Sequence, residues 1–216
     1  MPRNRLRPRK RRSNAASVDP ADVFINVPFG PSHERLYLAL IAGLKGLGLN
    51  PRCVVEVEAG EDRLERLLRL IERCAYSLHD LSHVRLCLAG KFRVPRFNMP
   101  FELGLAVAVA RHSQPYTWRI LEKVEHRLTC SLSDLNGFDP YTHDGTAEGT
   151  MEALASIFCD LAAPPMRDPA DLMQVYRQLR DYRRARLGKN IFAAYPFGEL
   201  VVAAKELVLF TPRSTP

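Results

Sequence analysis

A single carboxylate stands in an otherwise apolar stretch that has the pattern of a helix start. Glu102 follows Phe101, and Asn98 and Pro100 come just before. Asparagine is a favoured N-cap and proline a favoured first helical residue, so the pattern predicts a helix over about residues 99–112. In the first turn, Glu102 would complement the helix dipole, which stabilises by a few tenths to about 1 kcal/mol. The alternative is carboxylate chemistry, with Glu102 as a nucleophile or as the partner of a developing cation.

Other polar residues follow short apolar runs of the kind that form buried strands. In an open α/β sheet, ligands bind at the carboxyl ends of the strands. The residues that the sequence places there are Asn26, Pro28, Phe29, Gly30, Glu56, Glu58, His79, Asp80, Ser82, Asn98, Glu102, Glu122 and His126. Each also has a structural explanation. His79 could be a core histidine, Asp80 could cap a turn, and Glu56 could simply be the polar residue of an alternating strand. Their coincidence at one edge favours a functional site.

The elements that must position these residues alternate between strand and helix. Strands are predicted at residues 23–27, 53–57, 76–81 and 116–124, and helices at residues 33–49, 62–74, 99–112 and 146–161. Between them, we expect a basic loop at 82–97, a short helix at 129–135, and a loop or short strand at 137–145. This order predicts a parallel sheet with helices on both faces.

The chain divides into three parts by composition. We expect a disordered basic tail and linker at residues 1–20, an α/β domain at 21–163, and a C-terminal helical extension at 164–216. The extension is predicted to contain helices at 169–187 and roughly 197–209, packed on the domain or on a second copy.

The net charge of +7 belongs to the tail, because residues 3–12 hold seven arginines and lysines and no acidic residue. Two interpretations of this tail remain open. It makes weak contact with nucleic acid or another polyanion, or it is a solvated extension without a partner.

Cysteine use and hydropathy indicate a cytoplasmic protein. The five cysteines are scattered without metal-ligand spacing, which favours free thiols in a reducing compartment; they are Cys53, Cys74, Cys87, Cys130 and Cys159. No apolar stretch approaches the ~18 residues of a membrane span, and the basic start is not followed by the apolar run of a signal peptide. We therefore expect no membrane segment.

Several enzyme classes are disfavoured by missing motifs. The sequence has no GxxxxGK[ST] phosphate loop, no GxGxxG fingerprint, no GxSxG elbow and no HExxH zinc motif. P-loop hydrolases, typical dinucleotide-dependent dehydrogenases, serine hydrolases and zincins are thus unsupported. Carboxylate chemistry in an α/β domain remains, and we expect neither a metal nor a cofactor.

Four blocks of residues together resemble a known superfamily. They are Asn26-Val27-Pro28-Phe29, His79-Asp80-Leu81-Ser82, the block from Pro95 to Gly104 (PRFNMPFELG), and the segment from Ser131 to His143 (SLSDLNGFDPYTH). The first three are similar to the nucleoside 2-deoxyribosyltransferase superfamily, in which a strand ends in a Pro-Phe loop, an Asp-bearing strand follows, and a Glu-Leu-Gly helix carries the nucleophile. Toll/interleukin-receptor (TIR) domains that cleave NAD share this plan. All four blocks resemble an uncharacterised bacterial group with an R-F-N-M-P-[FL]-E-L-G block, over roughly residues 22–162.

The resemblance implies a flavodoxin-like (Rossmann-like) three-layer fold with a parallel sheet of four to five strands. It also implies cleavage or transfer at the N-glycosidic bond of a nucleoside, nucleotide or NAD, with Glu102 as nucleophile and Asp80 and His79 assisting. The substrate would be contacted by Asn26, Pro28, Phe29, Arg96, Asn98 and Met99. Kinship further implies a homo-oligomer and, through the TIR-like relatives, a role in antiviral defence.

Two departures from the transferase pattern keep other functions open. The transferases usually have a Gly-Thr pair shortly before the nucleophile, where this chain has Asn98-Met99-Pro100-Phe101. They also use a carboxylate from the C-terminus of a neighbouring subunit, and residues 211–216 contain none. The alternative is a non-catalytic TIR-like module that binds a nucleotide or signal and acts through a partner. A third possibility is nucleic-acid association through the basic tail.

Overall fold

The computed structural model describes residues 17–58, 60, 62–83, 86–89, 91–95, 97–112, 115–125, 127–128, 132–135 and 137–212. The expectations for the basic tail, residues 3–12, therefore fall outside the described residues.

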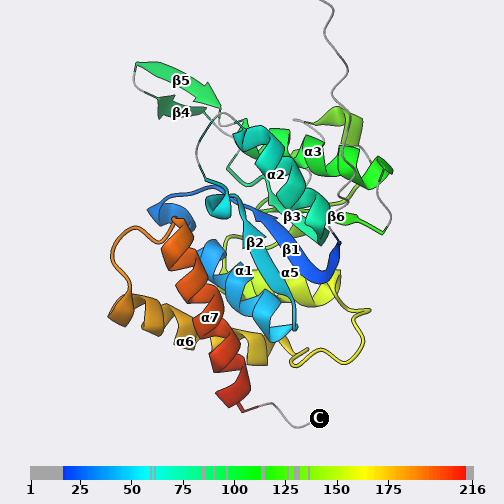
Figure 1. Cartoon of the computed structure of the whole chain (residues 1–216). Helices are drawn as coiled ribbons and strands as arrows, with labels where there is room; N and C mark the ends of the chain where they lie inside the picture. The colour runs from blue at the N-terminus through cyan, green and yellow to red at the C-terminus, as the bar shows by residue number, and fades with distance from the viewer. Residues whose placement is uncertain are drawn as a thin grey trace, which may run out of the picture.

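A five-stranded sheet forms the centre of the molecule (Figure 1). Its strands are β1 (Asp19–Asn26), β2 (Asn50–Cys53), β3 (Cys74–Asp80), β6 (Thr117–Glu122) and β7 (Tyr141–Thr142). Each strand pairs in parallel with its neighbours, in the order β2-β1-β3-β6-β7. This is the flavodoxin-like order, with its switch point between β1 and β3. The predicted α/β fold is confirmed.

Six α-helices flank the sheet in the described part of the chain. On one face lie α1 (Glu34–Gly46) and α5 (Ala147–Ile157), and on the other α2 (Arg63–Arg73) and α3 (Asn98–His112). The C-terminal helices α6 (Pro169–Arg186) and α7 (Ala194–Phe210) pack against the outer side of α1 and share one apolar core with the sheet. Of the two arrangements expected for the extension, the structure shows packing on the domain itself.

Helix α1 is buried nearly all round because it lies between the sheet and the C-terminal helices. All residues from Leu36 to Gly46 are buried, as expected for a helix without a polar face. Two glycines permit the close packing. A Cβ at Gly43 or at Gly46 would lie 2.4 Å from a side-chain atom of Leu154 or of Leu172, respectively.

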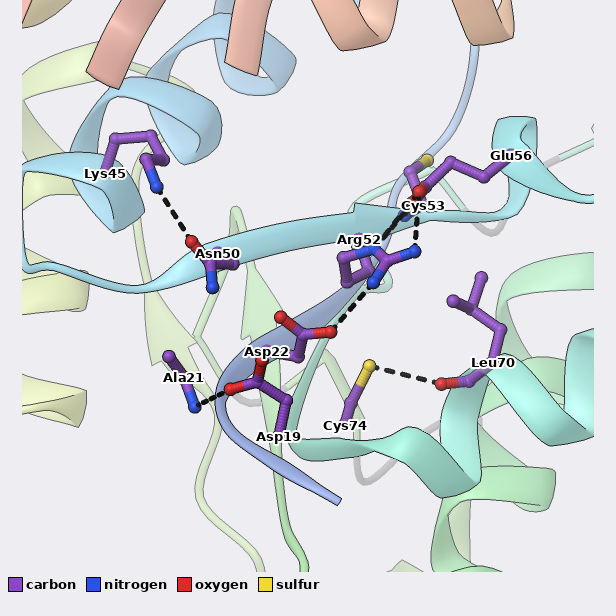
Figure 2. Close-up of polar contacts among 10 residues, drawn as sticks. All are labelled: Asp19, Ala21, Asp22, Lys45, Asn50, Arg52, Cys53, Glu56, Leu70 and Cys74. Carbon is purple, nitrogen blue, oxygen red and sulfur yellow. Dashed lines mark hydrogen bonds and ion pairs between the residues drawn. The ribbon is translucent and has the colours of Figure 1, made fainter. Parts of the chain in front are cut away.

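The prediction for the second strand was wrong in position. The strand ends at Cys53, and the apolar run Val54–Glu56 forms a 3-10 turn instead. Glu56 folds back to accept a hydrogen bond of 2.8 Å from the backbone N–H of Cys53 and an ion pair of 2.8 Å from Arg52. Arg52 also pairs with Asp22 of β1 at 2.8 Å, so one guanidinium ties β1, β2 and the turn together (Figure 2).

Other element boundaries also differ from the expectations. The stretch expected to be a loop at 82–97 contains an antiparallel hairpin of β4 (Leu86–Ala89) and β5 (Phe92–Pro95). Helix α3 begins at Asn98, so Asn98 is its first residue rather than its N-cap, although assignments of helix ends vary by one or two residues. Only a 3-10 turn at Ser133–Leu135 is described where a short helix was predicted.

Candidate functional site

A chain of buried hydrogen bonds joins β3, β1 and the first turn of α3. Asn26 and His79 lie side by side at the carboxyl ends of β1 and β3. The Asn26 amide donates 2.9 Å hydrogen bonds to Nδ1 of His79 and to the backbone carbonyl of Met99. The other ring nitrogen of His79 bonds Oγ of Ser77 at 2.9 Å. Three of the resembling blocks therefore meet through Asn26.

These bonds fix the state of His79. Because the Asn26 amide donates to Nδ1, the imidazole proton resides on Nε2, which donates to Ser77. Burial lowers the pKa of His79 to about 3, since an imidazolium would be desolvated there. His79 is thus a neutral, fully buried residue, and its contacts suit it to holding Asn26 and, through it, the start of α3.

Glu102 lies one turn beyond Met99 in the same helix. It is 7 % exposed, and within the described residues its Oε2 has no hydrogen-bond partner. Burial raises the pKa of the Glu102 carboxyl to about 7, although the charge of Arg63 on α2 acts in the opposite direction. A carboxyl that titrates near neutral pH, with one oxygen unsatisfied, is suited to act as a nucleophile or to exchange a proton.

Asp80 belongs to a separate group of side chains. Its Oδ1 accepts a 2.8 Å hydrogen bond from the backbone N–H of Ser82 and lies 3.6 Å from Nε2 of His143. Successive residues of a strand point to opposite faces of the sheet. His79 points toward α3, so Asp80 points toward the face that α1 and α5 cover. Among the described residues, no hydrogen bond or ion pair joins Asp80 to Glu102.

Ser82 and His143 form a hydrogen bond that sequence reasoning missed as a contact. The two side chains are buried, and Oγ of Ser82 lies 2.9 Å from Nε2 of His143. The backbone N–H of Gly145 donates to Nδ1 of His143, so Nε2 carries the proton and donates to Ser82. That tautomer cannot accept a proton from the serine, so the pair does not have the arrangement of a serine nucleophile and its base. The signal was present, because both residues belong to the resembling blocks.

An open hollow of about 420 Å³ lies at the carboxyl ends of β1 and β2. Its lining includes Phe29, Arg63, the residues 54–58 after β2, and residues 192–194 before α7. The Phe29 ring packs against Phe192, with centroids 5.5 Å apart, and against Tyr37 at 6.3 Å. Glu102 does not line this hollow. Arg63 connects the two, since it lines the hollow and its charge lowers the pKa of Glu102.

The remaining expected site residues lie in different surroundings. Pro28 is buried, and Asn98 is exposed at the start of α3. Met99 is buried in a small apolar cluster with Leu81, Leu103, Ile120 and Leu128, so its side chain faces the core. Arg96 and His126 lie outside the described residues.

Two further carboxylates at this edge are engaged in ion pairs. Glu56 pairs with Arg52, as described above. Glu122, at the end of β6, is buried, pairs with Arg127 at 3.0 Å and accepts a hydrogen bond from the backbone N–H of Lys123. Glu102 and Asp80 therefore differ from these neighbours, because each keeps one buried oxygen without a hydrogen-bond partner in the described part of the chain.

The described ranges contain neither a metal-binding cluster nor a helix that could span a membrane. Within them, no group of three or more histidine, cysteine, aspartate or glutamate side chains is arranged to hold a metal ion. None of the described helices has the length and apolar character needed to cross a bilayer.

Comparison with models of known protein families gave no match, and comparison with curated protein sequences gave none either.

Proposed function

We propose that this protein cleaves, or transfers at, the N-glycosidic bond of a nucleoside, nucleotide or NAD, with Glu102 as the nucleophile. One observation carries the proposal: a buried carboxyl with an unpartnered oxygen and a pKa near 7 lies in the helix that follows β3. Open α/β sheets bind ligands at this edge, next to the switch point between β1 and β3. Unpaired, desolvated carboxyls are costly, and they are commonest where they react with a ligand.

The bond-breaking step needs no catalytic side chain other than Glu102. Its ionised oxygen attacks C1′ of the sugar while the C1′–N bond breaks and the electron pair leaves with the base. The glycosyl ester is then released by water or by a second base. An oxocarbenium-like transition state gains from the negative charge beside it, which also favours the ionised form of Glu102.

The surroundings of Glu102 favour a base that leaves without a proton. His79 remains neutral with a pKa of about 3, and Asp80 points to the other face of the sheet. A neutral nucleoside needs a general acid for its leaving base, whereas a pyridinium base such as nicotinamide leaves as a neutral molecule. We therefore rank NAD-type substrates first. The hollow beside Phe29 and Phe192 would take the base, and Arg63 would pair with a phosphate group.

The test is release of free base from NAD and from each 2′-deoxynucleoside, followed by chromatography. We expect Glu102→Gln to lower base release by at least about 100-fold, because the amide is not nucleophilic. Glu65→Gln, which removes an exposed carboxylate on α2, serves as the matched control and should leave the rate unchanged. Equal release by Glu102→Gln and the wild type would contradict the role of Glu102.

A binding module without turnover is the second candidate. It is favoured by the separation of Glu102 from the open hollow, which leaves the hollow as the accessible surface at this edge. This candidate predicts that NAD or a nucleotide raises the melting temperature without release of base. Stabilisation that persists in Glu102→Gln and is lost in Arg63→Ala would support it over the enzyme.

A further inference from the structure

A second hollow, of about 350 Å³, lies between the start of α1 and the last turns of α6. The C-terminal extension supplies one wall and the α/β domain the other. Its lining is mainly polar and consists of Pro31, Glu34, Arg35, Leu38, Tyr176, Arg180 and Arg184. Glu102 and the residues of the hollow beside Phe29 are not part of it.

The one carboxylate in this lining is already neutralised. Arg183 of the adjacent helix α6 pairs with Glu34. Its Nε lies 2.8 Å from one carboxylate oxygen, and a second guanidinium nitrogen lies 2.9 Å from the other. This ion pair joins α6 to α1. Glu34 is therefore not free to balance the other arginines.

The remaining arginines carry excess positive charge. Arg180 and Arg184 share a single carboxylate, Asp181, at 3.2 and 3.8 Å. Arg35, across the hollow on α1, has no carboxylate partner among the described residues. Like charges held close together raise the energy of the empty site, and an anion in the hollow would relieve that repulsion.

Tyr176 forms the buried side of the hollow. The residue as a whole is 6 % exposed, and it lines the hollow together with Arg35, Arg180 and Arg184. Burial raises the pKa of Tyr176, while Arg35, Arg180 and Arg184 all act to lower it, so all three charges lie near its hydroxyl. The hollow therefore brings a hydroxyl, which can donate a hydrogen bond, together with three guanidinium groups.

We propose that this hollow binds a compact anion bearing several phosphate groups, such as the phosphate chain of a nucleotide or a free polyphosphate. Guanidinium groups bind phosphate oxygens in a bidentate manner, and the tyrosine hydroxyl adds a neutral donor. The first turn of the thirteen-residue helix α1 contributes its positive end at the same place. Because the arginines surround one hollow from two helices, the site fits two or three phosphates better than an extended nucleic-acid backbone.

The site gives the C-terminal extension a function of its own. Occupation would strengthen the contact between α6 and α1, because the anion would bridge Arg35 of one helix to Arg180 and Arg184 of the other. The proposal does not depend on cleavage at Glu102, and each can fail without the other.

Calorimetric titration of the full chain with tripolyphosphate, ATP and inorganic phosphate tests the proposal. We expect tripolyphosphate to bind, inorganic phosphate to bind at least 10-fold more weakly, and Arg35→Ala/Arg184→Ala to weaken tripolyphosphate at least 10-fold. Tyr176→Phe keeps the ring and should weaken binding several-fold. Arg69→Ala, which removes an exposed arginine on α2, is the matched control and should bind like the wild type.

Comparison of ATP with tripolyphosphate distinguishes a nucleotide from a free polyphosphate as the ligand. Equal affinities for ATP and tripolyphosphate would assign recognition to the phosphates alone, and tighter binding of ATP would add contacts from the nucleoside. The N-terminal tail is present in every variant, so its contribution cancels. The proposal is overturned if the double variant binds like Arg69→Ala, or if a single-stranded oligonucleotide binds through Arg35 and Arg184 more tightly than tripolyphosphate.

A separate observation concerns the outer face of α7. Tyr195, Val202 and Leu209 lie seven residues apart on this face and are 74 %, 57 % and 73 % exposed. Gly198 lies on the same exposed face with open space around it, although glycine inside a helix costs about 1 kcal/mol relative to alanine. A helix that presents regularly spaced apolar residues and a small residue is suited to contact with another helix.

We further propose that the α7 helices of two copies pack antiparallel about a two-fold axis at Val202. This register places Tyr195 opposite Leu209 of the second copy, and the two Val202 side chains against each other. It also places Glu199, whose Oε2 accepts a 3.4 Å hydrogen bond from Tyr182, opposite the exposed Lys205 of the second copy, so the stripe is complementary to itself in charge. That self-complementarity favours a second copy of this chain over an unrelated partner.

Sedimentation velocity of the full chain with charge reversals tests this register. We expect a dimer whose dissociation constant rises at least 10-fold in Glu199→Lys and in Lys205→Glu, and recovers in the double variant. Glu152→Lys, the same charge change on an exposed position of α5, should leave the dimer intact. A wild-type monomer at 100 µM, or a double variant no tighter than the singles, would overturn the proposed pairing.

Discussion

Two buried carboxyls lie at the same edge of the sheet and differ in how they are held. Asp80 is fully buried and tied, because its Oδ1 accepts from the backbone of Ser82 and lies beside His143. Each keeps one buried oxygen without a partner in the described residues, but no hydrogen bond is described for the other oxygen of Glu102, and burial raises the pKa of Glu102 to about 7. The α3 side of the edge thus holds a desolvated carboxyl, and the α5 side a hydrogen-bonded one.

The difference separates a group that stabilises the fold from one that costs stability. The contacts of Asp80 Oδ1 with the Ser82 backbone and His143 offset part of the cost of burying that residue. Nothing comparable is described for Glu102, although the bond from Asn26 to the Met99 carbonyl fixes the helix turn just before it. A rigid backbone around an unsatisfied side chain is the arrangement expected for a reactive group. Removing the Asp80 carboxylate should therefore lower the free energy of unfolding, whereas neutralising Glu102 should raise it.

The largest effect is expected from Asp80→Ala. It removes the acceptor for the backbone N–H of Ser82 and leaves His143 without its carboxylate in a buried site. We expect a loss of about 3 kcal/mol in the free energy of unfolding, measured with urea at pH 7. A loss below about 1 kcal/mol would show that these contacts do not stabilise the fold.

Glu102→Gln should instead stabilise the protein, by an amount that grows as the pH rises from 4.5 to 7. The folded-state pKa of Glu102 is raised from 4.5 to about 7, so the protonated form that folding favours is fully present below pH 4.5 and is lost as the pH rises through 7. The wild type should therefore lose up to about 3 kcal/mol between pH 5 and pH 8 through this group.

Urea unfolding of both proteins at pH 5 and pH 8 measures this difference. The advantage of Glu102→Gln over the wild type in the free energy of unfolding should be about 2 kcal/mol greater at pH 8 than at pH 5. The comparison of the two carboxyls breaks down if the variant is destabilised at both pH values, since Glu102 would then be held as Asp80 is.

A smaller effect is expected from Ser82→Ala. The change removes one buried hydrogen bond with His143, and the expected loss is about 1 kcal/mol in the free energy of unfolding. Base release, if the proposed activity exists, should be unchanged because this serine is not activated by His143. A large loss of activity with little loss of stability would indicate that the reactive centre lies on the α5 side of the sheet, near Ser82 and His143.

The order of elements could be predicted from the sequence, since apolar runs and helical periodicity are local signals. The second strand was misplaced because Val54, Val55 and Val57 form an apolar run that looks like a strand. The turn there depends on Arg52, which reaches both Glu56 and Asp22 of a different strand. The β4–β5 hairpin was missed because both strands are only four residues long and β4 is apolar throughout, so the segment shows no sustained alternating pattern. Such features depend on contacts that no local window contains.

The site was predictable only in part, for the same reason. A charge in an apolar helix start singles out Glu102 in the sequence, and in the structure that carboxyl is buried with one unpartnered oxygen; its role as a nucleophile stays a prediction. The sequence could not show that Asn26 bonds a carbonyl 73 positions away or that Ser82 meets His143, 61 positions away. Strand alternation implies that His79 and Asp80 point to opposite faces, but the partners that each residue meets there could not be read from the sequence.

The most direct measurement of the central claim is the titration of Glu102 itself. Protein labelled with ¹³C at glutamate side-chain carboxyls, compared with Glu102→Gln, identifies the one resonance that disappears. We predict that this resonance titrates with a midpoint near 7, because the carboxyl is desolvated and one of its oxygens is unpartnered. A midpoint at or below the ordinary value of 4.5 would mean that Glu102 is solvated or paired, and would contradict the account.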